Sequence, residues 1–152
     1  MRVWKAKWLM NLYPPLLVNR ISVKRISSDY KLVEVRVKKS LLNRNLQKSI
    51  FGGTIFSAAD PFHALMYWQI FKMKGVSCEA WLKRAEIQYL KPANSDLRLL
   101  FEISDDDIKI VNAQLEERGK AEMVHETAIL NNKNETVAFV RSTISLKKKL
   151  SV

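Results

Sequence analysis

The fold of this chain is decided by residues 51–73, Phe-Gly-Gly-Thr-Ile-Phe-Ser-Ala-Ala-Asp-Pro-Phe-His-Ala-Leu-Met-Tyr-Trp-Gln-Ile-Phe-Lys-Met. Between Thr54 and Met73 nearly every residue is apolar, which predicts a helix that is buried on most of its sides. Thr54 is a typical N-cap residue, and the two glycines before it let the backbone bend sharply. Pro61 lacks a backbone donor, so we expect it to kink or restart the helix, which Gly75 then closes.

One carboxylate, Asp60, interrupts this apolar run. Burying an acid among apolar residues costs free energy unless the acid is hydrogen-bonded or used in chemistry. Because Asp followed by Pro is also the signature of an N-cap and a first helical residue, Asp60 either restarts the helix or serves a function. In the second case, burial among Phe56, Ala59 and Phe62 would raise its pKa and make it a better base than a surface Asp.

Period-two patterns on both sides of this helix predict an antiparallel sheet. Residues 30–38 alternate valines with charged residues, as a half-buried strand does. Four further strands are expected at residues 81–90, 97–103, 123–130 and 136–146. A helix capped by Ser104 and ended by Gly119 is inserted between the second and third of these. The sequence therefore predicts an α+β fold in which an antiparallel sheet of five or six strands wraps one long central helix.

The composition fits one globular domain. The chain has 152 residues, of which 47% are hydrophobic and 27% charged, enough to bury a single core. The single cysteine, Cys78, excludes an intrachain disulfide and favours a reducing, cytoplasmic compartment. No apolar run reaches the roughly 18 residues that span a bilayer. The sequence has no metal-ligand spacing of Cys and His, no phosphate-binding glycine loop and no catalytic serine motif, so we expect no metal and no cofactor.

Positive charge is concentrated in the first third of the chain. Residues 1–48 contain twelve Lys and Arg and two acids, a net charge of +10, whereas residues 49–152 contain fourteen and thirteen, a net charge of +1. A basic segment attracts polyanions such as nucleic acid, anionic lipid or the phosphates of coenzyme A, or it is simply a solvated surface. No RNA-binding aromatic signature or recognition-helix motif accompanies it, so we expect no nucleic-acid partner.

The first residues carry a short amphipathic helical pattern. Residues 2–12 include Trp4 and Trp8 among lysines and leucines, and a Pro-Pro pair ends the pattern. One interpretation is a helix packed over the open flank of the domain. The other is a peripheral membrane contact, with the indoles at the lipid headgroups and the lysines facing phosphate. We therefore divide the chain into an N-terminal helical and Pro-Pro segment, residues 1–28, and a main domain, residues 29–152.

The spacing around the glycine pair resembles that of the hotdog-fold thioesterases, in particular the phenylacetate-pathway type. In that family an Asn precedes a His-Gly-Gly motif, and an Asp follows on the central helix. The matching positions here are Asn45, Gly52, Gly53 and Asp60. Phe51 replaces the family's His. The resemblance covers residues 30–146 and implies a hotdog fold, closest to a thioesterase-like group in which a Pro-Pro segment precedes the core.

The same resemblance implies an acyl-CoA thioesterase that works as a homodimer or a dimer of dimers, with each site formed across two subunits. The family's carboxylate, here Asp60, acts as general base or nucleophile. Backbone N–H groups at the start of the central helix, here those of Gly53 and Thr54, polarise the thioester carbonyl. The family's Asn, here Asn45 with Asn43 as the alternative, orients the water or the substrate.

The expected substrate-binding residues are Phe51, Gly52, Arg44, Lys48 and His63. Arg44 and Lys48 flank Asn45 and would pair with the nucleotide phosphates. His63 follows Asp60 by three residues on the same helical face and either supports it or is a packed core histidine. Because a Phe donates no hydrogen bond, Phe51 implies a more apolar pocket, or weak or absent catalysis. The second hypothesis is therefore a non-catalytic module that binds acyl-CoA or an acyl chain.

Overall fold

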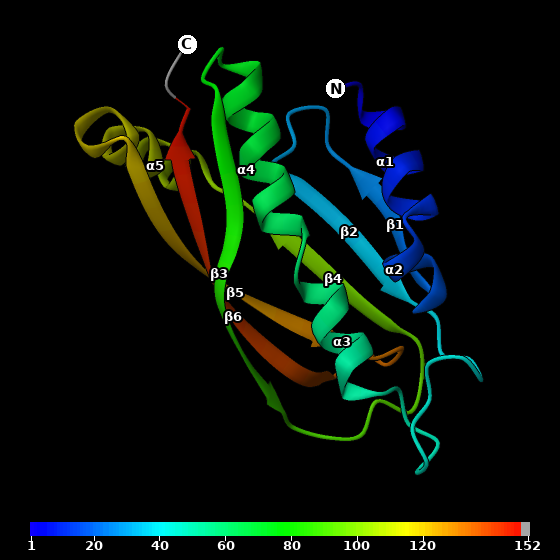
Figure 1. The fold of residues 1–152 in the computed structure, drawn as a ribbon. Coiled ribbons are helices and arrows are strands. Elements are labelled where there is room, and N and C mark those ends of the chain that lie inside the picture. The colour runs from blue at the N-terminus through cyan, green and yellow to red at the C-terminus, as the bar shows by residue number, and fades with distance from the viewer. Residues whose placement is uncertain (150–152) are drawn as a thin grey trace.

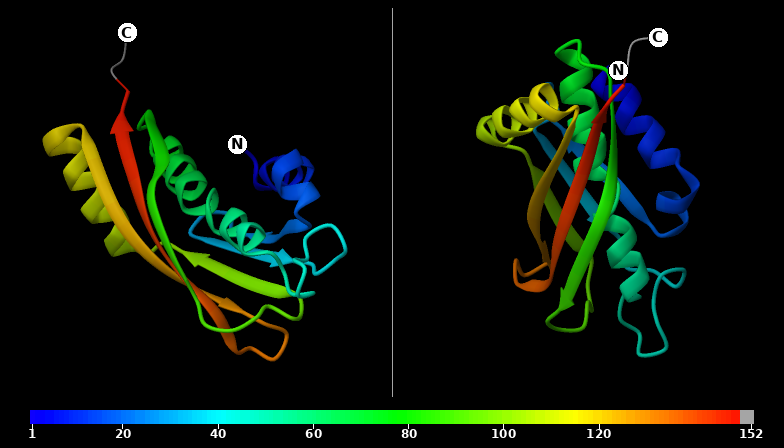
Figure 2. Two further views of the ribbon diagram at one scale, coloured as in Figure 1. Left: turned by 60° about the horizontal axis from the view of Figure 1, so that its bottom comes forward. Right: turned by 60° about the vertical axis from the view of Figure 1, so that its left-hand side comes forward.

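The chain folds into one antiparallel sheet that curves around a broken central helix (Figure 1). The computed structural model describes residues 1–149 and contains β1 (Ile21–Ile26), β2 (Leu32–Val37), β3 (Cys78–Tyr89), β4 (Leu97–Glu102), β5 (Lys120–Leu130) and β6 (Thr136–Lys148). The six strands lie in the order β1-β2-β4-β5-β6-β3. Figure 2 shows the central helix lying in the hollow of this curved sheet. The predicted α+β architecture is confirmed.

The central helix consists of α3 (Gly52–Ala59) and α4 (Phe62–Met73). The restart predicted at Pro61 is confirmed, because this residue occupies the N-cap position of α4. The inner side of α4 packs on the sheet, and the ring of Phe62 lies 5.0 Å from the ring of Phe101 on β4, centroid to centroid. Both rings are fully buried. The apolar run therefore forms the core, as its composition predicts.

The predicted N-cap role of Thr54 is wrong. Helix α3 begins at the glycine pair, and Phe51 occupies the N-cap position without a side-chain capping bond. The Thr54 hydroxyl instead lies within the first helical turn, where it donates a hydrogen bond of 2.8 Å to Oδ1 of Asn19. Asn19 follows α2 (Pro14–Val18), so this contact fixes α3 to the N-terminal segment.

Strand β1, which the sequence analysis did not identify, forms one edge of the sheet. It pairs antiparallel with β2 and buries Ile21 and Val23. The predicted helix in residues 2–12 is confirmed as α1 (Val3–Leu12), which lies along this edge. The Asn11 side chain donates to the Val23 carbonyl at 3.2 Å and accepts from the Val23 N–H at 2.7 Å. Because a bare edge strand invites pairing with another chain, α1 protects this end of the sheet.

The opposite edge of the sheet is β3, and no strand in residues 1–149 pairs with its outer side. Helix α5 (Asp105–Arg118) packs on β5 with its apolar side in the same core as the central helix, and it confirms the predicted inserted helix. Ser104 and Asp107 form a reciprocal capping box at its start. The predicted division at residue 28 stays a prediction. Strand β1 precedes that point and pairs with β2 beyond it, and residues 150–152 of the predicted main domain lie outside the described residues.

Candidate active site

Asp60 lies at the break between α3 and α4. It occupies the C-cap position of α3, while Pro61 occupies the N-cap position of α4, and within residues 1–149 no side chain caps the start of α4. The capping hydrogen bond that a purely structural Asp60 would make is therefore not formed. Within residues 1–149 its carboxylate has neither a hydrogen-bond partner nor an ion-pair partner.

The surroundings of Asp60 differ from the burial expected from sequence. Ala59 and Phe62 turn inward and are buried, whereas Asp60 is exposed on the side of the helices that faces away from the sheet. Phe56, one turn earlier, and Trp68, two turns later, are exposed on the same side, each at 38%. Partial desolvation by neighbouring atoms nevertheless raises the pKa of Asp60 above its ordinary value. A raised pKa makes the carboxylate a better proton acceptor.

The sequence predicts two backbone N–H donors at the start of α3, those of Gly53 and Thr54. Only one of them is unused in the structure. The Thr54 N–H donates to the Phe51 carbonyl at 3.0 Å, so it is not available to a substrate. The Gly53 N–H has no acceptor within residues 1–149. It lies in the first helical turn, where the aligned peptide dipoles favour negative charge.

The Phe51 ring packs against Gly53 at close range. A Cβ atom added at Gly53 would lie 2.3 Å from Cε1 of Phe51, so the ring packs directly on the glycine backbone. The ring is 57% exposed, so it is not held within the core. Gly52 is contacted from the other direction, because the Tyr89 hydroxyl donates to its carbonyl at 2.9 Å. Tyr89 ends β3 and was not among the residues expected at the site.

The Asn45 side chain organises the loop between β2 and α3. Its Oδ1 accepts from the N–H groups of Gln47 at 3.0 Å and Ser49 at 3.1 Å, and its Nδ2 donates to the Ser49 hydroxyl at 2.8 Å. Asn43 is buried, and its Nδ2 donates to the carbonyls of Asn19 and Lys38, each at 2.9 Å. Asn43 thus fixes the loop to the body of the domain, and Asn45 is the more accessible of the two.

A surface pocket of about 390 Å³ brings some of the expected residues together. Asn45 and Gly52 line it, with Tyr89 and Lys91 on the side of the edge strand β3. Phe51, Gly53, Thr54 and Asp60 are not among its lining residues. Arg44 and Lys48 are exposed in the same loop as Asn45. One chain therefore places Asn45 beside the glycine pair and leaves Asp60 on a separate surface.

His63 lies in the core and not beside the Asp60 carboxylate. It is 2% exposed, and its ring stacks on His125 of β5 with 4.2 Å between centroids. The Tyr67 hydroxyl lies 2.9 Å from Nε2 of His125. Burial, followed by the proximity of His125, lowers the pKa of His63 to about 3, and burial also lowers the pKa of His125. Both rings are therefore neutral at pH 7.

We expect His63 to make the fold sensitive to acid. Its pKa is about 3 in the folded chain and 6.5 when exposed, so the unfolded chain binds more protons between these values. Stability should rise with pH in that window, by up to about 1.4 kcal/mol per pH unit from this group. Denaturant unfolding from pH 7 to pH 4 measures the slope, which should flatten in His63→Phe. Equal slopes for variant and wild type would contradict the assignment.

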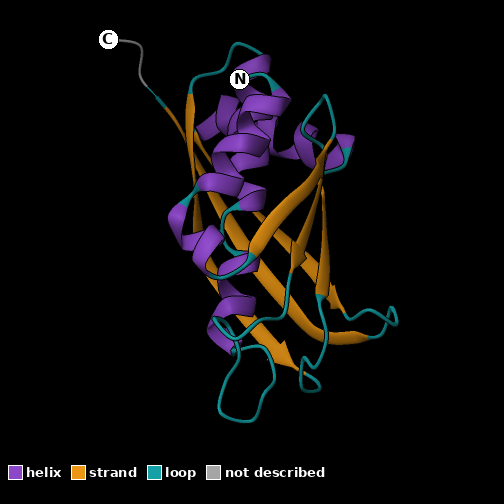
Figure 3. Ribbon diagram, turned by 90° about the vertical axis from the view of Figure 1, so that its right-hand side faces the viewer, coloured by secondary structure: helices purple, strands orange, loops and turns teal. Residues whose placement is uncertain are grey.

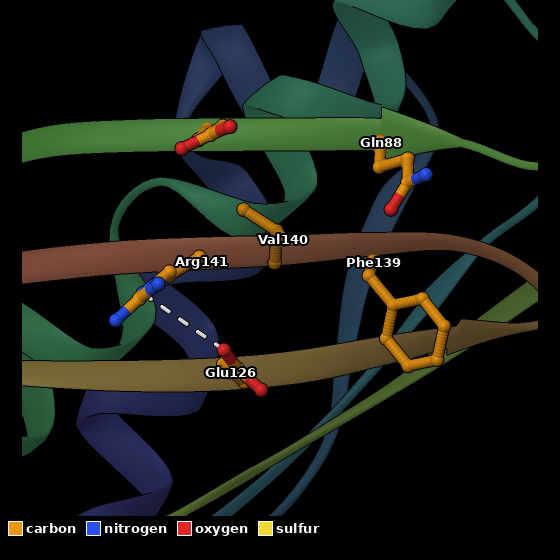
Figure 4. A pocket seen from close by; sticks show the side chains of 6 residues that line it. Gln88, Glu126, Phe139, Val140 and Arg141 are labelled. Carbon is orange, nitrogen blue, oxygen red and sulfur yellow. Dashed lines mark ion pairs between the residues drawn. The ribbon is translucent and has the colours of Figure 1, made fainter.

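The hollow on the outer face of the sheet contains no expected site residue. It measures about 340 Å³ and is lined by Glu86, Gln88, Glu126, Phe139, Val140 and Arg141 (Figure 4). Its charges are already partly matched, because Nε of Arg141 lies 3.8 Å from Oε1 of Glu126. The elements around Asp60 and Gly53 therefore remain the better candidate site.

Residues 3–146 match the model of a protein family described as a domain of unknown function, DUF4442. The chain belongs to this family. Among curated proteins, none matches the sequence of this chain.

Solved structures with the same architecture include proteins named as thioesterases. A Pseudomonas aeruginosa protein of unknown function, described as a probable thioesterase, is 19% identical with a TM-score of 0.83, over 98% of this chain and 97% of its own. The Escherichia coli PaaI protein from the phenylacetic acid degradation operon is 20% identical with a TM-score of 0.66, over 98% of this chain and 94% of its own. A Haemophilus influenzae thioesterase is 11% identical with a TM-score of 0.70, over 99% of this chain and 94% of its own. The hotdog fold predicted from sequence is confirmed.

Proposed function

We propose that this chain is an acyl-CoA thioesterase-like hydrolase whose site forms where two copies meet. The observation that carries the proposal is Asp60, a carboxylate with a raised pKa that caps no helix and has no partner within residues 1–149. It lies between exposed aromatic side chains on a helix surface that faces away from its own sheet. The thioesterase names of structural relatives support the choice of reaction.

A second copy of the chain would complete the site. Strand β3 is an unpaired edge within the described sheet, and α4 contacts it closely. Pairing of β3 with its counterpart would extend the sheet, cover Phe56 and Trp68, and bring Asp60 of one subunit toward Gly53 of the other. A dimer of dimers would be assembled from two copies of this β3-paired dimer. Light scattering at micromolar concentration that returned the mass of one chain, 17.6 kDa, would contradict this assembly.

The proposed chemistry uses one carboxylate and one backbone donor. Asp60 accepts a proton from a water molecule, and the resulting hydroxide forms a bond to the thioester carbonyl carbon. The Gly53 N–H, with the start of α3, stabilises the negative charge that develops on the carbonyl oxygen. The carbon–sulfur bond then breaks, the thiol leaves with the proton held by Asp60, and the carboxylic acid is released. General base catalysis contributes about 10²- to 10⁴-fold, and one oxyanion donor about 10²- to 10³-fold.

The alternative is a non-catalytic module that binds acyl-CoA or an acyl chain. Phe51 favours it, because a Phe donates no hydrogen bond where the thioesterase family has His, and because its ring packs against Gly53, the residue of the backbone donor. A panel of acyl-CoA esters of increasing chain length separates the two functions. Release of free thiol above the uncatalysed rate supports the hydrolase. Saturable binding without thiol release supports the binding module and contradicts the hydrolase.

Arg44 and Lys48 are proposed to dock the coenzyme A phosphates. Both are exposed in the loop that carries Asn45, and neither forms an ion pair within residues 1–149. Arg44→Ala with Lys48→Ala should raise KM for acyl-CoA about five- to tenfold and leave KM for a small uncharged thioester unchanged. The difference should shrink as salt rises, because exposed charges are screened over about 10 Å at 0.1 M.

The matched control for this docking is Lys133→Ala, which removes an exposed lysine from the turn between β5 and β6. Its KM for acyl-CoA should equal that of the wild type. Equal KM values for the Arg44/Lys48 variant and the wild type would remove the docking role and leave the chemistry of Asp60 untouched.

We also propose a cytoplasmic location. Cys78 is a free, buried thiol, which suits a reducing compartment.

A further inference from the structure

Helix α1 exposes an apolar stripe on the side that faces away from the domain. Trp4, Trp8 and Leu12 follow one another at intervals of four residues, and their exposed fractions are 56%, 63% and 58%. The opposite side of the helix packs inward, where Ala6 is fully buried. An ordinary surface helix is polar on its outer side, so this helix carries an apolar surface that the fold itself does not use.

The apolar surface continues beyond α1. We call it the α1–α2 strip, and its exposed residues are Trp4, Trp8, Leu9, Leu12, Tyr13, Leu17 and Val18. Asn43 donates to the carbonyl of Asn19 just after α2, so the next loop is held at the end of the strip. That loop exposes Leu41 at 75% and Leu46 at 103%. Figure 3 views the molecule from the side on which Figure 1 shows α1 and α2. Large apolar side chains exposed together in this way mark an interaction site.

The proposed dimer does not account for the strip. Helix α1 packs along β1, whereas the proposed dimer forms through β3, at the other end of the strand order. Pairing at β3 therefore leaves the α1–α2 strip uncovered. A second copy of the chain is also a poor occupant, because it would place two segments of net charge +10 against each other.

A basic groove of about 370 Å³ adjoins the strip. Asn11 of α1 and Leu17 of α2 line one side, and Arg20, Lys24 and Lys38 contribute positive charge. None of these three cations forms an ion pair within residues 1–149, whereas the Arg36 guanidinium in the same groove is matched by Asp96 at 2.7 Å. The groove therefore combines unmatched positive charge with Leu17, a residue that it shares with the α1–α2 strip.

We propose that the α1–α2 strip and this basic groove form a docking surface for an anionic phospholipid bilayer. Indole and phenol rings prefer the boundary between headgroups and acyl chains, and leucines insert just below it. Arg20, Lys24 and Lys38 then pair with lipid phosphate and with the anionic surface. Nucleic acid offers the same negative charge but no apolar phase for the strip. No helix in residues 1–149 combines the length and hydrophobicity that a membrane crossing requires. The inference does not depend on the proposed hydrolysis.

The experiment uses the full chain with vesicles of phosphatidylcholine, with and without phosphatidylserine. In a Trp68→Phe/Trp81→Phe background, Trp4 and Trp8 are the only indoles, because the chain has four tryptophans. Their emission should shift to shorter wavelength when phosphatidylserine vesicles are added. Co-sedimentation gives the partition coefficient, which should fall about tenfold or more in Trp4→Ser/Trp8→Ser and in Arg20→Gln/Lys24→Gln/Lys38→Gln.

Phe139→Ser is the matched control, since it removes an aromatic residue that is 43% exposed on β6, and its partition coefficient should equal that of the wild type. Free glycerol phosphate should not displace the protein from vesicles, which separates a bilayer from a soluble phosphate ligand. Failure of the wild type to bind phosphatidylserine vesicles overturns the proposal. So does equal binding by the Trp4/Trp8 variant. A Trp4/Trp8 variant that changes the oligomer mass and not vesicle binding would identify a second copy as the occupant.

Discussion

Asp60→Asn should lower kcat for acyl-CoA hydrolysis by about 100-fold or more, because the amide cannot accept a proton from water. KM should change little, since the side chain is not proposed to bind the nucleotide. Activity of the wild type should also fall as pH drops through the raised pKa of Asp60, because only the ionised carboxylate is a base. Thiol release measured across pH gives both results.

The same substitution should leave the fold intact. Asp60 makes no capping bond and is exposed, so the free energy of unfolding should change by less than about 0.5 kcal/mol. Asp106→Asn is the matched control, because Asp106 is an exposed helical acid whose ion pair with Lys109 lies on α5. Full activity in Asp60→Asn, at a pH where the wild type is active, would exclude Asp60 as the base.

The strongest local signals in the sequence predicted their elements well. The apolar run after the glycine pair became α3 and α4, and the Ser104 cap with Gly119 bounded α5, where Gly119 adopts a φ of 66°. Strand β1 was missed because its alternation is interrupted. The pairing with β2 shifts register between Val23 and Arg25, so the period of two that identifies a strand does not persist there.

Only part of the candidate site could be predicted from the sequence. Spacing along the chain placed Asn45 near the glycine pair, and Asn45 and Gly52 line one pocket. The contact of Tyr89 with Gly52 joins residues that are far apart in the chain, so no local sequence pattern predicts it. The side of the helix on which Asp60 lies could not be predicted either. In a nearly uniformly apolar helix, the packing of the sheet decides which side is buried.

A second large effect is expected at the start of α3. Gly53→Pro removes the one backbone donor that the site is proposed to use, and should lower kcat about 100-fold. Proline is tolerated in the first turn of a helix, and the Gly53 N–H makes no hydrogen bond within residues 1–149 that would be lost. The exposed Phe51 ring has room to move away from the new side chain. Circular dichroism and thermal unfolding should confirm that the variant is folded.

The most direct measurement of the central claim, one catalytic centre built from Asp60 of one subunit and Gly53 of the other, is the activity of mixed dimers. Asp60→Asn and Gly53→Pro chains, each inactive alone, are co-expressed in equal amounts and purified together. Half of the dimers would then be mixed, and each mixed dimer would hold one site with neither defect, so about a quarter of wild-type activity should return. A mixture no more active than either variant alone, with mixed dimers demonstrated by two affinity tags, would contradict a site shared between subunits.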